Sequence, residues 1–268
     1  MPGVPDRLYV RARAALLDAV EALETHLDAV VLVGAQAIYQ HTGDADLAVA
    51  EYTTDADFSV SPAELADAPL LGDLLAGHGF TPREHPGQLA QPRRHPHRHH
   101  GPRGPRRSRH AWRPTRATRQ AGGAPGQGLE GALVDRDRHS IAALDPSDNR
   151  QISMWVAGPG ALLVAKVHKI AERVDASDRV RDKDALDVLR LLRAIDTDGL
   201  AARLRSLVAH DVAGPVTTEA VGLVRQLFGT EQSDGVVMAV RAAGTSEDAA
   251  MITGSMVALA TDVTSALG

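Results

Sequence analysis

The alternation of apolar and polar residues divides the chain into a mixed first half and a helical second half. Apolar residues recur at helical spacing between residues 6 and 27, which predicts an amphipathic helix. The apolar run that follows, residues 30–33, is short enough for a buried strand and ends at Gly34. A further helix is expected to begin at Ala35, so the stretch predicts a helix, a strand, a glycine turn and a helix.

A second strand and a third helix are expected in the next thirty residues. Residues 55–60 have the pattern of a short strand. Ser61 stands before a proline, and Glu64 follows three positions later, which is the arrangement of a capping box at a helix start. The pattern therefore predicts a helix that begins at Ser61 and ends at Gly77 or Gly79.

The remaining chain is expected to contain two more strands and then helices alone. Residues 128–137 and 150–159 are strand-like. Beyond them, helical patterning covers residues 160–174, 181–195, 198–210, 217–229 and 246–267. The expected fold class is α+β, with a mixed sheet and flanking helices in a first domain of residues 1–157. An all-helical domain of residues 158–268 follows.

Residues 86–127 break this patterning. The segment is rich in arginine, histidine, proline and glycine, and it has neither a helical nor a strand period. Six of the twelve histidines of the chain lie between His85 and His110, which separates this segment from the rest in composition. We therefore expect residues 86–127 to be an irregular part of the first domain.

Composition narrows the chemistry that is available. The chain has 268 residues and a formal net charge of −5, which argues against a general polyanion-binding protein. It contains no cysteine, so disulfides and thiolate zinc sites are excluded. No segment approaches the apolar length of a membrane span, and the charged N-terminal stretch is unlike a signal peptide. We expect a cytoplasmic protein without membrane association.

Asp55 and Asp57 are the first candidate functional residues. In a strand, side chains two positions apart share one face, so the two carboxylates are expected to project together. Adjacent carboxylates repel each other unless a cation lies between them, and Mg²⁺ or Mn²⁺ accepts such oxygen ligands. The alternative is an exposed strand edge with solvated acids, and the short motif alone does not decide between the two.

The turn at Gly34 adds a second candidate site. Gly34 separates an apolar strand from an expected helix, and backbone N–H groups at a helix start can bind phosphate. A strand, a glycine turn, a helix and a strand with paired aspartates therefore place a phosphate site beside a metal site.

These stretches resemble a known family. VLVGAQAIYQHTG followed by TTDADFSV is similar to the start of a minimal nucleotidyltransferase of the DNA polymerase beta superfamily. The resemblance is closest to the AbiEii-like group, which includes bacterial toxins of toxin–antitoxin pairs. It implies that Gly34 and Ala35 bind nucleotide phosphates, while Asp55 and Asp57 hold the metal ion and are catalytic. Ala35 replaces the small hydroxyl residue often found at this turn, so the backbone alone would bind there.

The resemblance extends into the helical half. LLVAKVHKIAER and RDKDALDVLRLL match a lysine, an arginine and paired aspartates that the family carries on helices. The match implies that Lys166 neutralises triphosphate charge and is catalytic together with Asp187. Arg173 and Asp184 are implied to bind the nucleotide with Lys166. From the residues alone, Asp184 and Asp187 suit the orientation of Lys166 or a surface salt-bridge network.

Other charged residues of the helical half have simpler interpretations. His168 and Lys169 fit a solvated face of their helix. The acids around the start of the next helix are also expected to form a solvated face rather than a partner site. These acids are Asp175, Asp178, Asp182 and Asp184.

A third acidic residue is implied by the resemblance, on a strand within residues 86–127, as a metal ligand or general base. This segment contains neither Asp nor Glu. A shift of reading frame accounts for the difference. Read from the second base of each codon, residues 92–102 can encode DGIPIDIMV, an apolar strand with an aspartate where Arg98 stands. Normal patterning returns near Gly128, which suggests a compensating second shift.

Two other interpretations of the segment are open. Residues 93–119 could form a basic arm that binds tRNA or another nucleic acid through phosphate contacts. His97, His99 and His100 could bind Zn²⁺ or Ni²⁺, but no acidic partner for them is visible in the sequence.

The function implied by the resemblance is nucleotidyl transfer. An NTP bound with Mg²⁺ or Mn²⁺ would donate NMP to a tRNA 3′ end or a protein side chain, and a cognate antitoxin would be a partner. Without the third carboxylate we expect weak or absent activity, with residual NTP binding. The alternatives are a nucleic-acid-binding protein that uses residues 93–119 and an inactive toxin remnant with a structural role.

Overall fold

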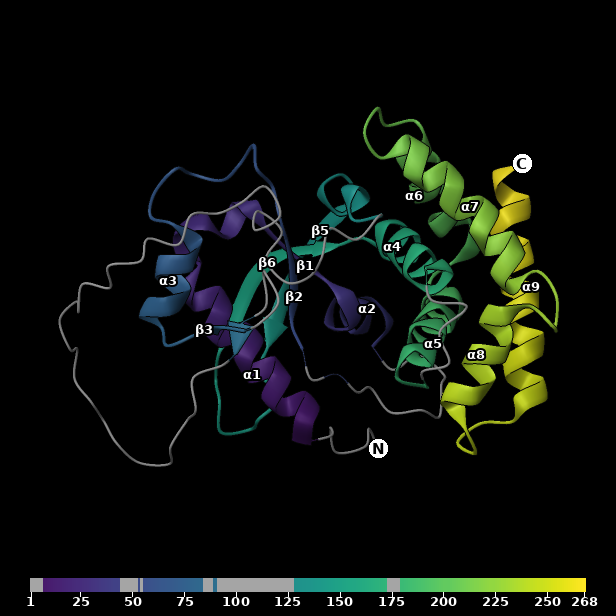
Figure 1. The fold of residues 1–268 in the computed structure, drawn as a ribbon, viewed down its shortest axis with the longest axis horizontal. Coiled ribbons are helices and arrows are strands. Elements are labelled where there is room, and N and C mark those ends of the chain that lie inside the picture. Colours follow the sequence, from purple (N-terminus) through teal and green to yellow (C-terminus); the bar gives the residue numbers. More distant parts are fainter. Residues whose placement is uncertain (1–6, 44–52, 54, 84–88, 91–127, 173–178) are drawn as a thin grey trace.

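A four-stranded mixed sheet forms the centre of the first half of the chain (Figure 1). The computed structural model describes residues 7–43, 53, 55–83, 89–90, 128–172 and 179–268. The strands of this sheet are β1 (Val30–Val33), β2 (Asp57–Val60), β5 (Arg136–Ala142) and β6 (Gln151–Ala157). Their order is β2-β1-β6-β5. Strand β1 is antiparallel to β2 and parallel to β6, while β5 and β6 are antiparallel. The expected mixed sheet with helices is confirmed.

Strand β1 lies inside the sheet because all four of its residues are apolar. All four are buried, and Val31 is level with Ser59 of β2 and with Trp155 of β6. A strand covered on both faces needs a continuous apolar run rather than an alternating one. The strand expected at residues 30–33 is therefore confirmed at both ends.

Two helices of the first half pack beside each other. They are α1 (Arg7–Ala22) and α2 (Gly34–Thr42), and α2 contacts β1, β2 and β6. The rings of Tyr9 and Tyr39 meet edge to face with their centroids 5.4 Å apart. The first helix ends earlier than expected, and the 3-10 helix η1 (Glu24–Ala29) leads from it into β1.

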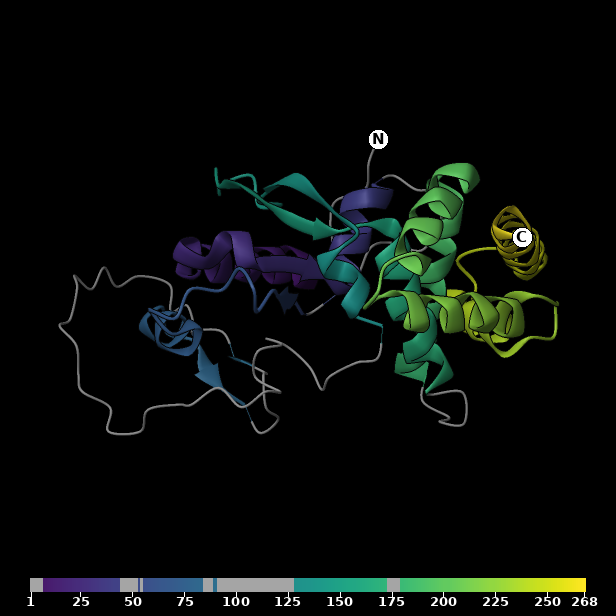
Figure 2. The ribbon, with the colours of Figure 1, turned by 90° about the horizontal axis from the view of Figure 1, so that it is seen from above.

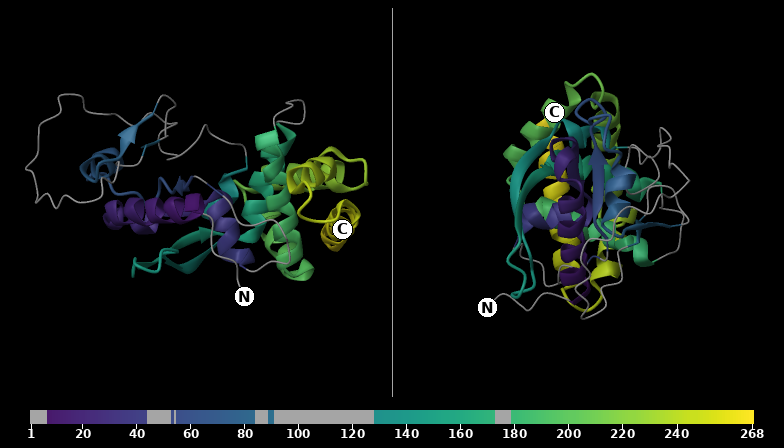
Figure 3. Two further views of the ribbon diagram at one scale, coloured as in Figure 1. Left: turned by 90° about the horizontal axis from the view of Figure 1, so that it is seen from below. Right: turned by 90° about the vertical axis from the view of Figure 1, so that its left-hand side faces the viewer.

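In the described part of the chain, six helices follow the sheet. They are α4 (Pro159–Ala171), α5 (Arg179–Ala194), α6 (Thr197–Val208), α7 (Gly214–Phe228), α8 (Asp234–Ala243) and α9 (Ala249–Leu267). Figures 2 and 3 show these helices gathered at one end of the molecule, with α1 at the other. The helical second half is confirmed, although the sequence pattern did not single out α8.

The helix expected from Ser61 begins ten residues later, as α3 (Leu71–Gly77). The residues after Ser61 form a turn closed by backbone bonds to its carbonyl. Pro69 explains the delay, because proline lacks an N–H group and disfavours helical backbone at the preceding residue. The Glu64 carboxylate forms an ion pair with Arg136 of β5 at 2.7 Å, so this acid joins the turn to the sheet.

Four residues of the stretch expected as a strand at residues 128–137 form a 3-10 helix instead, η3 (Glu130–Leu133). Only its end belongs to β5. The η3 helix lies against α4, and a Cβ at Gly131 would be in van der Waals contact with the Ala161 side chain, at 3.4 Å. Two further short strands, β3 (Thr81–Pro82) and β4 (Leu89–Ala90), form a separate antiparallel pair.

A buried carboxylate joins the sheet to the helical half. Asp135 accepts a hydrogen bond from the Ala161 N–H at 2.9 Å and caps the first turn of α4. It also accepts one from Arg203 of α6. A Cβ at Gly158 would lie 2.1 Å from the Asp135 carboxylate, so only glycine fits where β6 leads into α4. This joint fixes the direction in which α4 leaves the sheet.

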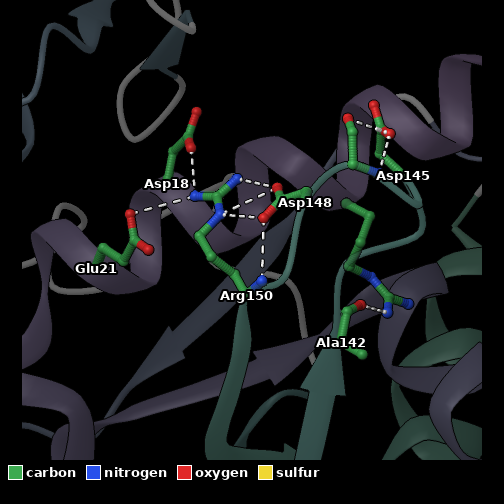
Figure 4. A network of polar contacts seen from close by, with 8 residues as sticks. Asp18, Glu21, Ala142, Asp145, Asp148 and Arg150 are labelled. Atoms are coloured by element: carbon green, nitrogen blue, oxygen red, sulfur yellow. Dashed lines mark hydrogen bonds and ion pairs between the residues drawn. The ribbon is translucent and has the colours of Figure 1, made fainter.

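A second charged network ties the β5–β6 hairpin to α1 (Figure 4). Arg150 binds Asp148 of the hairpin at 2.6 Å and Asp18 of α1 at 2.7 Å. Arg13 of α1 also donates a hydrogen bond to the Ala142 carbonyl of β5 at 3.0 Å. The first helix is therefore joined to this end of the hairpin by two arginines, one from each element.

Helix α9 departs from the expectation that no segment could span a membrane. In the described chain it is the one helix long and apolar enough to cross a membrane by length and composition. Its only charged residue is Asp262, and alanine, valine, leucine and methionine fill much of the rest. The helix packs against α5, α6, α7 and α8. Its apolar character therefore serves at least in part to close the helical bundle.

Candidate functional site

The carboxylate of Asp57 lies directly against the glycine turn. Asp57 opens β2 and is level with Val33, the last residue of β1. Gly34 follows with a φ of +72°, and a Cβ at this position would lie 2.4 Å from the Asp57 Oδ2 atom. A side chain at residue 34 is thus disfavoured both by the left-handed backbone and by the carboxylate. The expected proximity of the glycine turn and this aspartate is confirmed.

The start of α2 has no side-chain cap from its own N-cap residue. The helix begins at Gly34, and the N-cap residue Val33 makes no side-chain capping hydrogen bond. First-turn N–H groups carry partial positive charge and have no partner within the helix. Ala35, the next residue, is half-buried. The arrangement of backbone donors beside a carboxylate therefore suits a phosphate that brings a cation with it.

Asp55 lies just before β2 rather than within it. The strand begins at Asp57, two residues later than the sequence pattern predicts. Asp55 is exposed, and its charge is one of the factors that raise the pKa of Asp57. The two carboxylates are therefore close enough to interact. Two oxygen donors, with phosphate and water oxygens to complete the shell, fit Mg²⁺ or Mn²⁺.

A buried cluster of lysine and aspartate lies between α4 and α5. The Lys166 ammonium is 6% exposed and contacts the carboxylates of Asp184 at 2.5 Å and Asp187 at 2.7 Å. Burial lowers the pKa of Lys166, but the two carboxylates outweigh it and the net pKa is raised. Lys169 reaches the second oxygen of Asp184 at 3.0 Å. The structure thus brings together three of the predicted residues and adds Lys169.

This cluster lies within electrostatic range of Asp57. Burial raises the pKa of the Asp57 carboxyl, and Asp55 and Asp184 raise it further. Lys169 and Lys166 act in the opposite direction, with Lys169 the stronger. Helix α2 of the first half of the chain packs against α5 of the helical half. In this contact the Arg190 guanidinium lies 5.3 Å from the centroid of the Tyr39 ring. The helical lysines therefore act electrostatically on the Asp57 carboxyl.

Lys169 was not predicted from the sequence as a site residue. Its side chain is 43% exposed, so its ammonium is accessible while Lys166 is enclosed. The signal for it was the spacing of Lys166 and Lys169, which puts both on one face of α4. The neighbouring His168, expected on a solvated face, is buried and bonds the Val216 carbonyl at 2.9 Å. That expectation was wrong because α7 covers this side of α4.

The acids at the start of α5 also differ from the expected solvated face. Asp182 and Asp184 are buried, and Asp182 binds Arg241 of α8 at 3.0 Å. The α5 helix is enclosed by α4 and α8, which pack on either side of it. Asp175 and Asp178 lie outside the described residues. The buried acids therefore each have a basic partner on a neighbouring helix.

Several predicted features lie outside the described residues. These are Arg173, the basic arm of residues 93–119, the third acidic position at Arg98, and the candidate metal ligands His97, His99 and His100. Within the described ranges, no group of three or more histidine and acidic side chains is arranged to hold a metal ion.

Acid is expected to weaken the lysine–aspartate cluster through Asp184. Burial alone would raise the pKa of this carboxyl, but Lys166 and Lys169 lower it from 3.8 to about 2. A lowered folded-state pKa contributes stability that is complete above 3.8 and is lost as the pH falls toward 2. Between pH 6 and pH 3, the free energy of unfolding of an Asp184→Asn variant should therefore fall by about 1 kcal/mol less than that of wild type.

Urea unfolding at the two pH values measures this difference. Asp198→Asn is the matched control, because Asp198 is an exposed acid in the first turn of α6. The control is expected to lose as much stability as wild type. Equal acid losses in wild type and in Asp184→Asn would contradict the prediction.

Comparisons of the chain with protein-family models, with curated proteins and with solved structures find no match. The fold and the site together define an α+β protein in which a glycine turn and two strand acids adjoin a buried lysine–aspartate cluster.

Proposed function

We propose that this protein has a nucleotidyltransferase-type site that binds an NTP with Mg²⁺ or Mn²⁺ and transfers NMP to a hydroxyl group. The observation that carries this proposal is the contact between Gly34 and Asp57. A carboxylate packed against an uncapped helix start, where no Cβ fits, sets a metal ligand beside a phosphate-binding turn. The nucleotidyltransferase fold itself is part of the proposal.

Each described residue has a distinct role in the proposed site. The N–H groups that begin at Gly34 and Ala35 bind phosphate oxygens. Asp55 and Asp57 hold the metal ion, which supplies positive charge against the phosphates. Lys169, the accessible cation, faces the triphosphate, whereas Lys166 is enclosed between two carboxylates.

Lys166 and Asp184 support Lys169 in this arrangement. Asp184 accepts from both ammonium groups, so Lys166 holds the carboxylate that in turn directs Lys169. Asp187 fixes Lys166 from the other side. Fixed charges of this kind need no reorganisation when the phosphates bind, which is the main electrostatic contribution in such sites.

The proposed reaction is the attack of an acceptor hydroxyl on the α-phosphate. A bond forms between the hydroxyl oxygen and phosphorus, and the bond to pyrophosphate breaks, with release of the hydroxyl proton. The acceptor classes are a tRNA 3′ end and a protein side chain, and an antitoxin is the proposed protein partner. Because residues 86–127 contain no Asp or Glu, we expect transfer far slower than in a site with three carboxylates.

Binding and transfer are tested separately. Calorimetry with each NTP and Mg²⁺ is expected to show binding that Asp57→Asn abolishes. Incubation with α-labelled NTPs and total RNA or total protein then measures transfer, which Asp57→Asn is expected to reduce by at least about a hundredfold. Asp28→Asn is the matched control, because its carboxylate is 81% exposed and pairs only at the surface with Arg138.

The outcomes separate the proposed function from its alternatives. Asp57-dependent binding without transfer would indicate an inactive remnant that retains the nucleotide site. NTP binding that Asp57→Asn leaves unchanged would contradict the proposal. Salt-sensitive RNA binding that is lost on deletion of residues 93–119 and does not depend on Asp57 would favour the nucleic-acid-binding alternative.

A further inference from the structure

A buried glutamine links α1, α2 and the segment that carries Asp55. Gln36 lies in the first turn of α2 and is 1% exposed. Its Nε2 group donates to the Asp55 carbonyl at 3.1 Å and to the Ala12 carbonyl at 3.2 Å. Its Oε1 atom accepts from the Arg13 Nε group at 3.0 Å. Every polar atom of this side chain therefore has a partner from another part of the chain.

Arg13 is held in turn by several groups. It donates to the Tyr9 hydroxyl at 2.8 Å and to the Ala142 carbonyl at 3.0 Å. The Gln40 side-chain oxygen, with its amide oriented to satisfy both groups, accepts from Arg13 at 2.6 Å. A buried network with satisfied partners is rigid, because each member restricts the next. Gln36 is the member of this network that reaches the candidate site.

The Asp55 backbone also contacts the neighbouring Thr53 side chain. The Thr53 hydroxyl lies 3.3 Å from both the N–H and the carbonyl of Asp55. This is a local turn contact, at the long end of the range for hydrogen bonds. The bond from Gln36 ties Asp55 to a buried helix.

We infer that Gln36 is a positioning residue that holds the Asp55 segment, so that the Asp55 and Asp57 carboxylates converge on one cation. The inference rests on the proposed function for its catalytic meaning. Asp57 is fixed by strand pairing with Val33, whereas Asp55 lies outside β2. Gln36 thereby supplies for Asp55 the constraint that the sheet supplies for Asp57.

Two substitutions remove this contact in different ways. Gln36→Glu preserves the shape and the Arg13 contact, but it places an oxygen against the Asp55 and Ala12 carbonyls. Gln36→Met fills a similar volume without a donor. The matched control is Gln40→Glu, because Gln40 contacts the same Arg13 guanidinium from the next turn of α2. The control carries the same change in side chain without touching the Asp55 contact.

Hydrogen–deuterium exchange of the whole protein without ligand is the first measurement. Both Gln36 variants are expected to exchange about tenfold faster in peptides that cover residues 53–57, with α6 and α7 unchanged. Gln40→Glu is expected to match wild type in that segment. Unchanged exchange in the Gln36 variants, or equal acceleration in Gln40→Glu, would overturn the inference whether or not the protein binds nucleotides.

Mn²⁺ binding in the presence of an NTP, followed by electron paramagnetic resonance, is the second measurement. The Gln36 variants are expected to bind Mn²⁺ about tenfold more weakly, and the conservative Gln40 variant is expected to bind as wild type. If Mn²⁺ binding depends on Asp57 but the Gln36 variants bind Mn²⁺ as tightly as wild type, the inference about Gln36 is overturned and the proposed function is not. Binding that is independent of Asp57 would overturn the proposed function and the catalytic part of the inference with it.

Discussion

A Gly34→Ala variant is expected to lose binding of NTP with Mg²⁺ by about a hundredfold or more and to unfold about 1–3 kcal/mol more easily. Two effects combine at this residue. The left-handed backbone, with a φ of +72°, disfavours any side chain, and the new Cβ would lie 2.4 Å from the Asp57 Oδ2 atom. Either the carboxylate or the turn must move, and both belong to the proposed site.

Gly43→Ala separates the two effects. Gly43 ends α2 with a φ of +44°, and a Cβ there has no neighbour within 4 Å among the described residues. It should cost stability through the backbone alone, about 1 kcal/mol, and leave nucleotide binding unchanged. Calorimetry and urea unfolding measure both properties. If Gly34→Ala binds NTP as tightly as Gly43→Ala, the contact between Gly34 and Asp57 has no functional role.

A Lys166→Met variant is expected to lose about 3–5 kcal/mol of unfolding free energy. The methionine fills most of the space but leaves the buried carboxylates of Asp184 and Asp187 without their shared cation. Asp187 is 1% exposed, so water cannot replace the lost ammonium without opening the helix pair. Urea or thermal unfolding measures the loss, with circular dichroism to confirm that the variant folds.

Lys169→Met is the matched control for Lys166→Met. Lys169 is partly exposed and shares only Asp184, so its removal is expected to cost about 1 kcal/mol or less. Its effect is expected in nucleotide affinity instead. Adding Asp187→Asn to Lys166→Met should recover part of the lost stability, because an amide needs no counter-charge. Equal stability losses in the two lysine variants would contradict a buried cluster.

Local patterns predicted the strand and turn of the site well. The short apolar run before Gly34 is a buried strand, and the glycine marks the entry to α2, as its pattern predicts. Asp57 was expected near that turn, and the structure brings it there through the antiparallel pairing of β2 with β1. These features depend on neighbours close in sequence, which is why the sequence was sufficient.

Features that depend on distant neighbours were harder to predict. The burial of His168 results from α7, which carries the carbonyl that its ring binds. The burial of Asp182 similarly depends on Arg241 of α8. Helical spacing identifies a face, but it does not say whether another helix covers it. The same limit hid the enclosure of Lys166 between Asp184 and Asp187, beside the accessible Lys169.

Gln36 shows the limit most clearly within the site. A glutamine in a helical pattern is ordinarily a solvated residue, and nothing adjacent in sequence marks it as buried. Its partners, Ala12, Arg13 and Asp55, come from both sides of it in the chain and meet only in the folded protein. The candidate acids could be named from the sequence, whereas the group that holds one of them could not.

The parallel pairing of β1 with β6 has a consequence for synthesis on the ribosome. It sets Val31 beside Trp155, so an interior strand of the sheet lacks one neighbour until most of the chain has been translated. Such long-range pairing slows folding, since a large loop must close before the pairing can be gained. A nascent chain that ends before residue 151 presents an apolar strand with an open edge, which invites aggregation. Pairing with β6 therefore protects β1 only once the chain has been synthesised beyond residue 157.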